Sequence, residues 1–411
     1  MWQMKTKLTL TVGVFNAALL LLTGCNSEQL SQEPEPISHD GNYISVEEAL
    51  ANAEETYRNI YGQTRSTQKK LSTVEFYGGT TRSNQDSEEY GYYIVNYDDG
   101  GFAILSADRR RLSTYAISDE GSLHLSDTIE NKGLSWYINK VLRYEESGSY
   151  LPIGGGGGNI PPLDSLPGQG PNKTEYEYFE VCKPLLTGIL KSMQQGSPFN
   201  NRCPVIGEIR SVTGCVPLAV GTVMAFFKWP KSIDGYNFDW NAMLTNKNHG
   251  GWAQLFYLLG KREYLNAEYK VSPLVATSVN PALIAPTMNK LGYKGAQYEN
   301  FTTSKVSQDL SKGNPVLVGG QSSEGGHRWV IDGAHGAIIT QPTFGNQTET
   351  RTVYYLHCVW GWGNTARGYY AFDSTGSAYL GGSPSTPDSG TSGSTPYFTD
   401  LTIAYNYSPN K

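Results

Sequence analysis

The stretch TGCVPLAVGTVMAFFKWP, residues 213–230, decides the fold. Its long apolar run predicts a helix over about 216–228 that ends before Pro230. Pro217 falls in the first helical turn, where its missing N–H costs little. Cys215 therefore lies at the helix N-terminus, where unpaired N–H groups and the positive end of the helix dipole lower the pKa of a thiol. A nucleophile and a buried structural cysteine both fit this position, since most free cysteines are of the second kind.

Composition bounds the size and class of the protein. The chain has 411 residues, which allows two or three domains of about 100–200 residues each. Charged residues make up 17% of it, against roughly 25% in a typical soluble domain, so a long disordered charged chain is excluded. The formal net charge of -6 implies no basic surface, which argues against nucleic acid as a partner.

The N-terminus predicts the compartment. Two lysines precede an apolar run over residues 8–22, as in a secretory signal peptide. LTGC at residues 22–25 resembles a bacterial lipobox, in which the cysteine receives a lipid and becomes the first residue of the mature chain. We therefore expect residues 1–25 to be a lipoprotein signal peptide, and the protein to be exported and held at the cell envelope or surface by a lipid on Cys25. A plain signal peptide with an incidental cysteine is the alternative.

Residues 26–42 are polar and are predicted to be a tether, and a compact α+β domain of residues 43–150 follows. Ser45 and Glu48 form a capping box at the start of a helix. The turn sequence DDGG at residues 98–101 predicts a β-hairpin. Together the patterns predict strands over 90–97, 102–106 and 112–117 and a last helix over 129–146.

Residues 151–176 form a Gly- and Pro-rich linker with five consecutive glycines at 154–158. Such a segment buries too little surface to order itself, and proteolysis concentrates in segments of this kind. A passive spacer and a cleavable junction between a propeptide and an enzyme are both consistent with it.

The second domain spans residues 177–411 and places helices before strands, a pattern typical of the α+β class. A stretch rich in Gly, Ser, Thr and Pro at 376–396 is predicted to be a mobile surface loop. Strands are predicted over 315–318, 327–331, 337–340, 352–359, 369–372 and 399–405.

A thiolate nucleophile needs a base, and His327 is the strongest candidate among six histidines. It lies in GGHRWVIDG, residues 325–333, where two glycines leave open space before a strand that fixes the imidazole. It follows Cys215 by 112 residues, a separation broadly like that in papain-type enzymes. A packing histidine at a strand start is the alternative. We expect His335, which follows a turn at Gly333, to be exposed.

The motif signals for metals and other cofactors are missing from this sequence. There is no CxxC pair, no HExxH motif and no phosphate-binding P-loop, so we expect no metal and no cofactor. If Cys25 carries a lipid, four cysteines remain in an exported protein, and they would suffice for two disulfides. Their pairing stays open; the four are Cys182, Cys203, Cys215 and Cys358.

Several motifs, in the right order, resemble the streptopain family of papain-clan cysteine peptidases. The resemblance covers roughly residues 45–405. Residues 100–121 resemble the family's inhibitory prodomain, and PLL at 184–186 resembles the start of its mature domain. The motifs of the peptidase are QGSPFN at 195–200, CP at 203–204, GCV at 214–216, HRWVIDG at 327–333 and WGWG at 360–363.

The resemblance implies a papain-like fold, with a helical half and an antiparallel β half, preceded by a smaller α+β prodomain. It implies a cysteine endopeptidase made as a self-inhibited zymogen, with polypeptides as substrates and its own prodomain as inhibitor. The residue roles that it implies are nucleophile for Cys215, base for His327, oxyanion-hole side chain for Gln195 and, for Trp360, the tryptophan beside the histidine.

The chain departs from the family at Val359, where an Asn usually precedes the first Trp of the WGWG segment. An apolar side chain cannot accept the imidazole N–H, so His327 needs water, a backbone carbonyl or another side chain as its partner. Met193-Gln194 stands where the family often has Trp-Gly, and Pro217 replaces a usual small residue. The alternatives to an active peptidase are a catalytically weak or inactive surface lipoprotein that binds protein or glycan, and an acyl-transferring relative.

Overall fold

The computed structural model of the chain describes residues 43–62, 69–82, 87–109, 111–124, 126, 129–138, 174–245, 247–273, 275–322, 325–343, 347–372 and 401–410. The predicted signal peptide with Cys25, the tether, the linker up to residue 173 and the loop at 376–396 lie outside these ranges. Within them, no helix is long and apolar enough to cross a membrane.

The first predicted domain forms a helix and an antiparallel meander. Ser45 accepts a hydrogen bond from the backbone N–H of Glu48 at 3.3 Å, and so caps the helix as predicted. The turn at residues 98–101 joins two antiparallel strands, which confirms the hairpin. Of the predicted helix over 129–146, residues 132–138 are helical and residues 139–146 lie outside the described ranges. The other elements are α1 (Val46–Tyr61), β1 (Leu71–Arg82), β2 (Ser87–Tyr97), β3 (Phe102–Ser106) and β4 (Thr114–Ser118).

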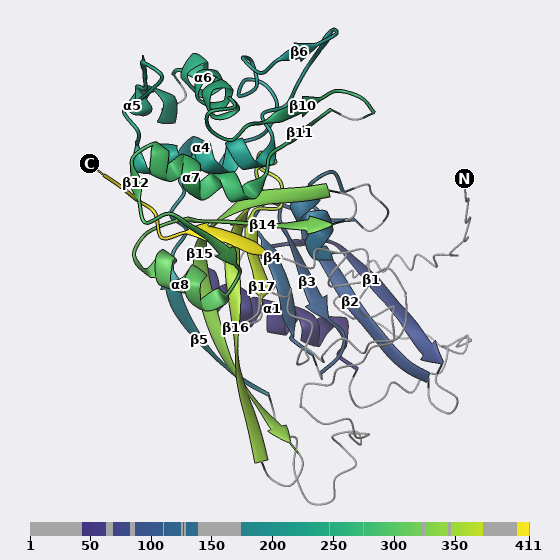
Figure 1. Cartoon of the computed structure of the whole chain (residues 1–411). Coiled ribbons are helices and arrows are strands. Elements are labelled where there is room, and N and C mark those ends of the chain that lie inside the picture. The colour runs from purple at the N-terminus through teal and green to yellow at the C-terminus, as the bar shows by residue number, and fades with distance from the viewer. Residues whose placement is uncertain are drawn as a thin grey trace, which may run out of the picture. The chain divides into compact units, whose positions relative to one another are not determined.

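Most helices of the second domain gather beside one part of its sheet, where α4 to α7 lie together (Figure 1). The first of them begins at Cys215 and ends at Phe227, within one residue of the predicted helix at each end. Its buried side chains pack on Leu317 and Val330 of the sheet. The helices are α4 (Cys215–Phe227), α5 (Trp240–Leu244), α6 (His249–Leu259), α7 (Ile284–Lys290) and α8 (Thr303–Ser311), with 3-10 turns at Gly188–Ser192 and Pro281–Leu283.

The long strands of the second domain form one antiparallel sheet, in the order β17-β16-β15-β14-β18-β13. The predicted strands at 327–331 and 337–340 are a single strand, β15. Its pairing with β16 shifts register between Ile331 and Gly333, and this irregularity lets the strand continue where the sequence predicts a turn. The strands are β13 (Gln297–Asn300), β14 (Val316–Ser322), β15 (Gly325–Thr343), β16 (Gln347–Val359), β17 (Gly368–Phe372) and β18 (Thr402–Tyr405).

Short two-stranded ribbons complete the helical half. Each pairs two segments of two or three residues. They are β6 (Val205–Ile206) with β7 (Ile209–Arg210), β8 (Ser232–Ile233) with β9 (Tyr236–Asn237), β10 (Glu268–Lys270) with β11 (Ala276–Ser278), and β12 (Tyr293–Lys294) with β19 (Ser408–Pro409).

A further strand, β5 (Glu175–Cys182), has no counterpart among the predicted elements. It pairs antiparallel with the second half of β15, where Glu180 lies opposite His335. His335 is 3% exposed, and its ring centroid lies 5.5 Å from that of Tyr369. The expectation that His335 is exposed is therefore wrong, because an additional strand and a neighbouring aromatic ring cover it.

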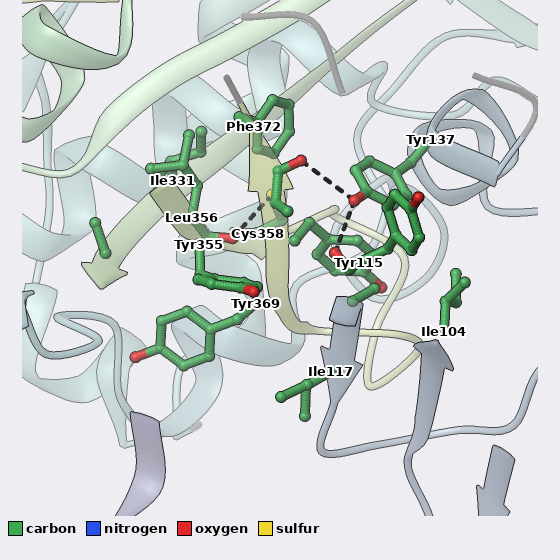
Figure 2. Close-up of a cluster of buried hydrophobic side chains, with 14 of the residues drawn as sticks. Ile104, Tyr115, Ile117, Tyr137, Ile331, Tyr355, Leu356, Cys358, Tyr369 and Phe372 are labelled. Atoms are coloured by element: carbon green, nitrogen blue, oxygen red, sulfur yellow. Dashed lines mark hydrogen bonds between the residues drawn. The ribbon is translucent and has the colours of Figure 1, made fainter. Parts of the chain in front are cut away.

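One antiparallel sheet spans both predicted domains, because β4 pairs with β17. A Cβ on Gly368 would collide with the backbone of Ile117, so the close approach of these two strands needs glycine. Side chains of both domains share one core (Figure 2). There the Tyr137 hydroxyl lies 2.7 Å from the carbonyl oxygen of Tyr115 and 3.2 Å from that of Ala371, and can donate to either.

Candidate active site

Cys215 is the first residue of α4, as the sequence predicts. Gly214 precedes it with a φ of 86°, a left-handed conformation that a side chain would strain. Thr277 of β11 packs against Gly214, and its hydroxyl donates to the carbonyl of Val212 at 2.6 Å. These contacts fix the chain immediately before the candidate nucleophile.

Two kinds of influence act on the Cys215 thiol in opposite directions. Burial raises its pKa, and this is the larger effect. The backbone N–H of Arg328, the charge of the Arg328 guanidinium and the N–H groups of Val216 and Cys215 lower the pKa. The predicted effect of the helix N-terminus is therefore present, but the pKa stays above its ordinary value. The sulfur carries its proton at neutral pH in this state.

His327 is buried on β15 and is held through its ring. Its Nε2 lies 2.9 Å from the backbone carbonyl oxygen of Trp360. Since a carbonyl only accepts, Nε2 carries the proton, and in the neutral ring Nδ1 is left without one. The Trp329 ring stacks on the imidazole at 6.0 Å and 15°, and the Trp362 ring lies 6.4 Å away. The side chain of Val359 cannot accept the imidazole N–H, and the backbone carbonyl of Trp360 accepts it instead.

The first domain covers His327. A Cβ on Gly133 would lie 3.0 Å from Cδ2 of His327 and would collide with the Trp360 ring. Gly133 lies at the start of the helix at 132–138, where the N–H groups of Gly133 and Leu134 each donate to Oδ1 of Asn131 at 3.1 Å. The backbone of the first domain therefore lies directly against the imidazole, with no room for a side chain between them.

His327 and Cys215 belong to opposite faces of β15. Successive side chains of a strand point to opposite faces. Trp329 shares the face of His327, and its ring lies 5.8 Å from that of Trp136 in the first domain. Val330 points the other way, into the core beneath α4 on which Cys215 packs. In the described part of the chain, no hydrogen bond joins the His327 imidazole to Sγ of Cys215.

The environment of His327 keeps its ring neutral. Burial is the main reason that its pKa is lowered to about 4; the hydrogen bond with Trp360 opposes the shift, and the charge of Arg328 adds to it. At neutral pH the imidazole is therefore uncharged while the Cys215 thiol is protonated. The described arrangement therefore lacks the thiolate–imidazolium pair that activates a cysteine nucleophile.

Gln195 reaches the same region through its backbone. Its carbonyl accepts a hydrogen bond from the N–H of Thr213 at 3.0 Å, two residues before Cys215. The neighbouring Gln194 forms an antiparallel bridge with Trp362. The half-buried Gln195 thus lies on a loop that is tied both to the nucleophile segment and to the WGWG segment.

Trp360 lies beside His327, but it contacts the imidazole through its carbonyl oxygen. Its indole N–H donates to the carbonyl of Ala366 at 2.9 Å, which fixes the ring. The aromatic rings closest to the imidazole belong to Trp329 and Trp362. The structure therefore brings the four predicted residues into one region and adds two aromatic neighbours.

Val359 packs in the core beneath α4, opposite Val330 in the β15–β16 register. A side chain at this position points away from the His327 face of the sheet. His357 belongs instead to a separate buried pair, with its Nδ1 2.5 Å from Oδ1 of Asp332.

The described residues contain no group of three His, Cys, Asp or Glu side chains that could hold a metal ion. Their four cysteines, whose pairing the sequence leaves open, are free thiols. Cys203 and Cys358 are buried, and burial raises the pKa of both. No cofactor enters the chemistry described below.

Two residues of the site, Gly133 and Arg328, are not singled out by the sequence. Gly133 carries no functional group, and its contact with His327 depends on packing between two domains. Arg328 is visible beside His327, but its burial depends on Gly319 and Thr402, which lie on other strands. One local signal places Arg328 on the α4 face: it directly follows His327 in a strand, and successive side chains of a strand point to opposite faces.

Two family models match the chain: the Peptidase C10 family over residues 193–370 and the Spi protease inhibitor over residues 41–143. The chain is 21% identical over 364 residues to Streptopain of Streptococcus pyogenes serotype M1, covering 76% of this chain and 79% of that protein. It is 22% identical over 360 residues to the Thiol protease/hemagglutinin PrtT of Porphyromonas gingivalis, covering 77% of this chain and 38% of that one. A prointerpain A fragment of Prevotella intermedia, 19% identical, shares the fold with a TM-score of 0.51, covering 80% of this chain and 98% of the fragment.

Proposed function

The chain belongs to the Peptidase C10 family and is a cysteine endopeptidase preceded by a Spi-type inhibitor domain, and from this we propose that Cys215 is its nucleophile and His327 its general base. One observation carries the assignment. The thiol at the start of α4 faces the backbone N–H of Arg328, the residue that directly follows His327. Because His327 lies on the opposite face of β15, its imidazole must turn towards α4 before it can reach the sulfur.

The chemistry follows from the two ring nitrogens of His327. In the described state Nε2 carries the proton, so Nδ1 is the nitrogen that would take the proton of the Cys215 thiol once the imidazole has turned towards the sulfur. The thiolate attacks the peptide carbonyl, and the imidazolium then gives its proton to the leaving amine. Water hydrolyses the thioester and returns the free thiol.

Gln195 and the Cys215 backbone N–H are the proposed donors to the oxyanion of the tetrahedral intermediate. A helix N-terminus offers such an N–H, and the Gln195 loop is tied to Thr213 just before it. Loss of one oxyanion donor typically costs about 10²–10³ in rate. Gln195→Ala should therefore lower kcat by about that factor.

We propose that the inhibitor domain keeps the enzyme latent by holding His327 on the face opposite Cys215. Gly133 lies against the imidazole, and Trp136 packs on Trp329, its neighbour on that face. Cleavage in the linker at 151–176 would let this domain leave. The imidazole would then regain solvent, and its pKa would rise towards the ordinary value.

We propose that the enzyme is exported and held at the cell envelope by a lipid on Cys25, with release after processing. The support is the sequence alone, with an apolar signal followed by LTGC at 22–25. The mass of the mature N-terminal peptide tests it. A diacylglycerol-bearing Cys25 is expected, and an unmodified N-terminus elsewhere would contradict it; Cys25→Ser should leave the chain unlipidated.

The binding-protein alternative rests on Val359, which gives His327 no side-chain partner. In the described state the backbone carbonyl of Trp360 is the partner of Nε2. A backbone acceptor so close to the imidazole supports the peptidase over the binding protein, because the imidazole then depends less on the side chain at position 359.

Casein digestion tests the assignment. The chain from Asn26 is incubated with casein, and the masses of both proteins are followed. Wild type should cut casein and shorten itself within the linker. Cys215→Ala should do neither, whereas Cys203→Ala, which removes a second buried thiol, should retain both. An active Cys215→Ala variant would refute the assignment.

A further inference from the structure

Arg328 carries a buried charge next to the proposed catalytic pair. The residue is 3% exposed. Its Nη1 donates to the backbone carbonyl of Thr402 at 3.0 Å, and its Nη2 donates to the Thr402 hydroxyl at 2.9 Å. The guanidinium lies 5.7 Å from the ring centroid of Tyr298, whose phenol also hydrogen-bonds to it. All these partners are neutral.

The charge has no counter-ion in the described part of the chain. The groups there that act on the Arg328 charge are Tyr298 and Cys215, and no carboxylate is among them. Nε is buried without a hydrogen-bond partner. Burying a cation without an anion is costly, so this arrangement indicates an anion that arrives from outside.

The sheet makes room for this guanidinium. Gly319 of β14 lies opposite Arg328 in the register, and Thr402 of β18 lies opposite Gly319. A Cβ on Gly319 would lie 2.7 Å from Nε and 2.9 Å from Cζ of Arg328. Any other residue at 319 would displace the side chain. Three neighbouring strands therefore hold the guanidinium in one place with its Nε–H unused.

Stabilising a Cys215 thiolate does not explain why a positive charge is buried at Arg328. The positive charge of Arg328 lowers the pKa of Cys215, but it also lowers that of His327. The fraction of thiolate–imidazolium pair depends on the difference between these two pKa values. A cation that lowers both leaves the difference nearly unchanged, so it gives little help to the ion pair.

We propose that Arg328 is a specificity-determining residue that binds the carboxylate of an Asp or Glu side chain of the polypeptide substrate, close to the scissile bond. This rests on the proposed function, since it places the substrate at Cys215. Two of the five guanidinium N–H groups go to Thr402, and Nε–H is free. Nε–H and an Nη–H form the edge that binds a carboxylate in bidentate fashion.

Matched peptides test this on the processed enzyme, obtained by letting the full chain mature. A peptide from its casein digest serves as parent. Glu and Gln are placed in turn at each of three positions on either side of the scissile bond, and kcat/KM is measured. At one position Glu should exceed Gln by roughly 10- to 100-fold, the range for a charge-assisted hydrogen bond. Asp is expected to rank above Asn there as well.

Arg328→Met keeps the apolar stem, and it should bring the Glu/Gln ratio at that position to about 1. Arg210→Met, in an exposed ribbon, is the matched control and should keep the wild-type ratio. The comparison of Glu and Gln peptides on the wild-type enzyme needs no variant. It can therefore refute the proposal even if Arg328→Met folds poorly.

Two results would overturn the proposal while the peptidase function stands. The first is equal cleavage of Glu and Gln peptides by wild type at every position. The second is an Arg328→Met enzyme whose kcat/KM falls by the same factor with all peptides and whose pH profile shifts at its acid side. That result would mean that the Arg328 charge stabilises the Cys215 thiolate. Failure to cut any peptide would overturn the proposed function together with this inference.

Discussion

Two buried histidines lie on neighbouring strands, and their surroundings differ. His327 donates to a neutral backbone carbonyl and is covered by the first domain through Gly133. His357 pairs with the carboxylate of Asp332 instead. That residue also accepts two backbone N–H groups of the segment after β5, Leu185 at 2.9 Å through its carbonyl and Leu186 at 2.8 Å through Oδ2.

The contrast separates His357, which has a structural partner, from His327, the proposed base. Asp332 ties His357 to residues 185 and 186 within the peptidase domain, so that pair persists when the first domain leaves. The cover over His327 comes from the first domain, which the proposed cleavage in the linker would release. Burial alone does not distinguish the two histidines; the cover from the first domain and the neutral partner support His327 as the proposed base.

The largest difference is expected in the reaction rate. His327→Ala removes the general base and should lower kcat/KM by roughly 10²–10⁴. His357→Ala breaks the pair with Asp332 and should lower the melting temperature, while the folded enzyme keeps kcat/KM within a few-fold. Steady-state kinetics and thermal unfolding of both variants decide the matter. A dead but fully stable His357→Ala enzyme would reverse the two roles.

The next effect concerns pH. The pKa of His327 is lowered to about 4 in the precursor and should approach the usual 6.5 when the first domain opens. Protonation favours the state with the higher pKa. The closed state is therefore fully favoured above about pH 6.5 and loses stability as pH falls towards 4, so the opening equilibrium should rise roughly 70-fold between pH 7.5 and 4.5.

Hydrogen exchange of the inactive Cys215→Ala precursor measures this opening without self-cleavage. Amides at 132–138, corrected for the intrinsic pH dependence of exchange, should open more often at pH 4.5. The same precursor with His327→Gln added should lose most of that pH dependence. A pH dependence that survives His327→Gln would place the titrating group elsewhere.

A smaller effect, on the rate of self-processing, is expected when the contact between Gly133 and His327 is altered. Gly133→Ala adds a methyl group that collides with the Trp360 ring and presses on His327, so it should weaken the closed state. Overpacking of this kind costs at least about 1 kcal/mol, which corresponds to self-processing about fivefold faster. Gly250→Ala, whose added Cβ would meet its nearest atom at 3.6 Å, is the control and should process at the wild-type rate. The two time courses are compared by mass; a slower Gly133→Ala would mean that the contact does not inhibit.

The smallest effect on rate is expected at Val359. From the sequence, Val359→Asn would give His327 a side-chain acceptor, but in the structure the side chain at 359 lies beneath α4 with Val330 and is 4% exposed. The buried amide should lower stability by about 1–3 kcal/mol and leave the pH profile of kcat/KM unchanged. An alkaline limb that moves upward would show that the amide reaches His327 after processing.

Local patterns in the sequence predict the parts of this site that depend on nearby residues. Gly214 and Pro217 around Cys215 are enough to place the start of α4, and the turn at 98–101 is enough to predict a hairpin. The family resemblance adds His327 and Trp360. Each of these signals spans a few residues, as helix caps and turns do.

Contacts between distant segments could not be predicted in this way. The burial of His335 needs β5 across β15, and the latent state of His327 needs Gly133 from another domain. The sequence left three kinds of partner open for His327, and the structure identifies one of them, the backbone carbonyl of Trp360. A backbone carbonyl carries no signature in the sequence, so the role of the Trp360 oxygen is visible only in the structure.

The pairing of β4 with β17 has a consequence for handling the processed enzyme. All five residues of β17, GYYAF, are buried in the shared sheet. When the first domain leaves, β17 loses β4 and becomes the outer strand of the sheet in the described part of the chain. Natural edges resist aggregation through charged side chains, proline or bulges, and this segment has neither charge nor proline. We expect the freed enzyme to associate edge to edge as its concentration rises, so the discarded domain also acts as a solubility chaperone for its own catalyst.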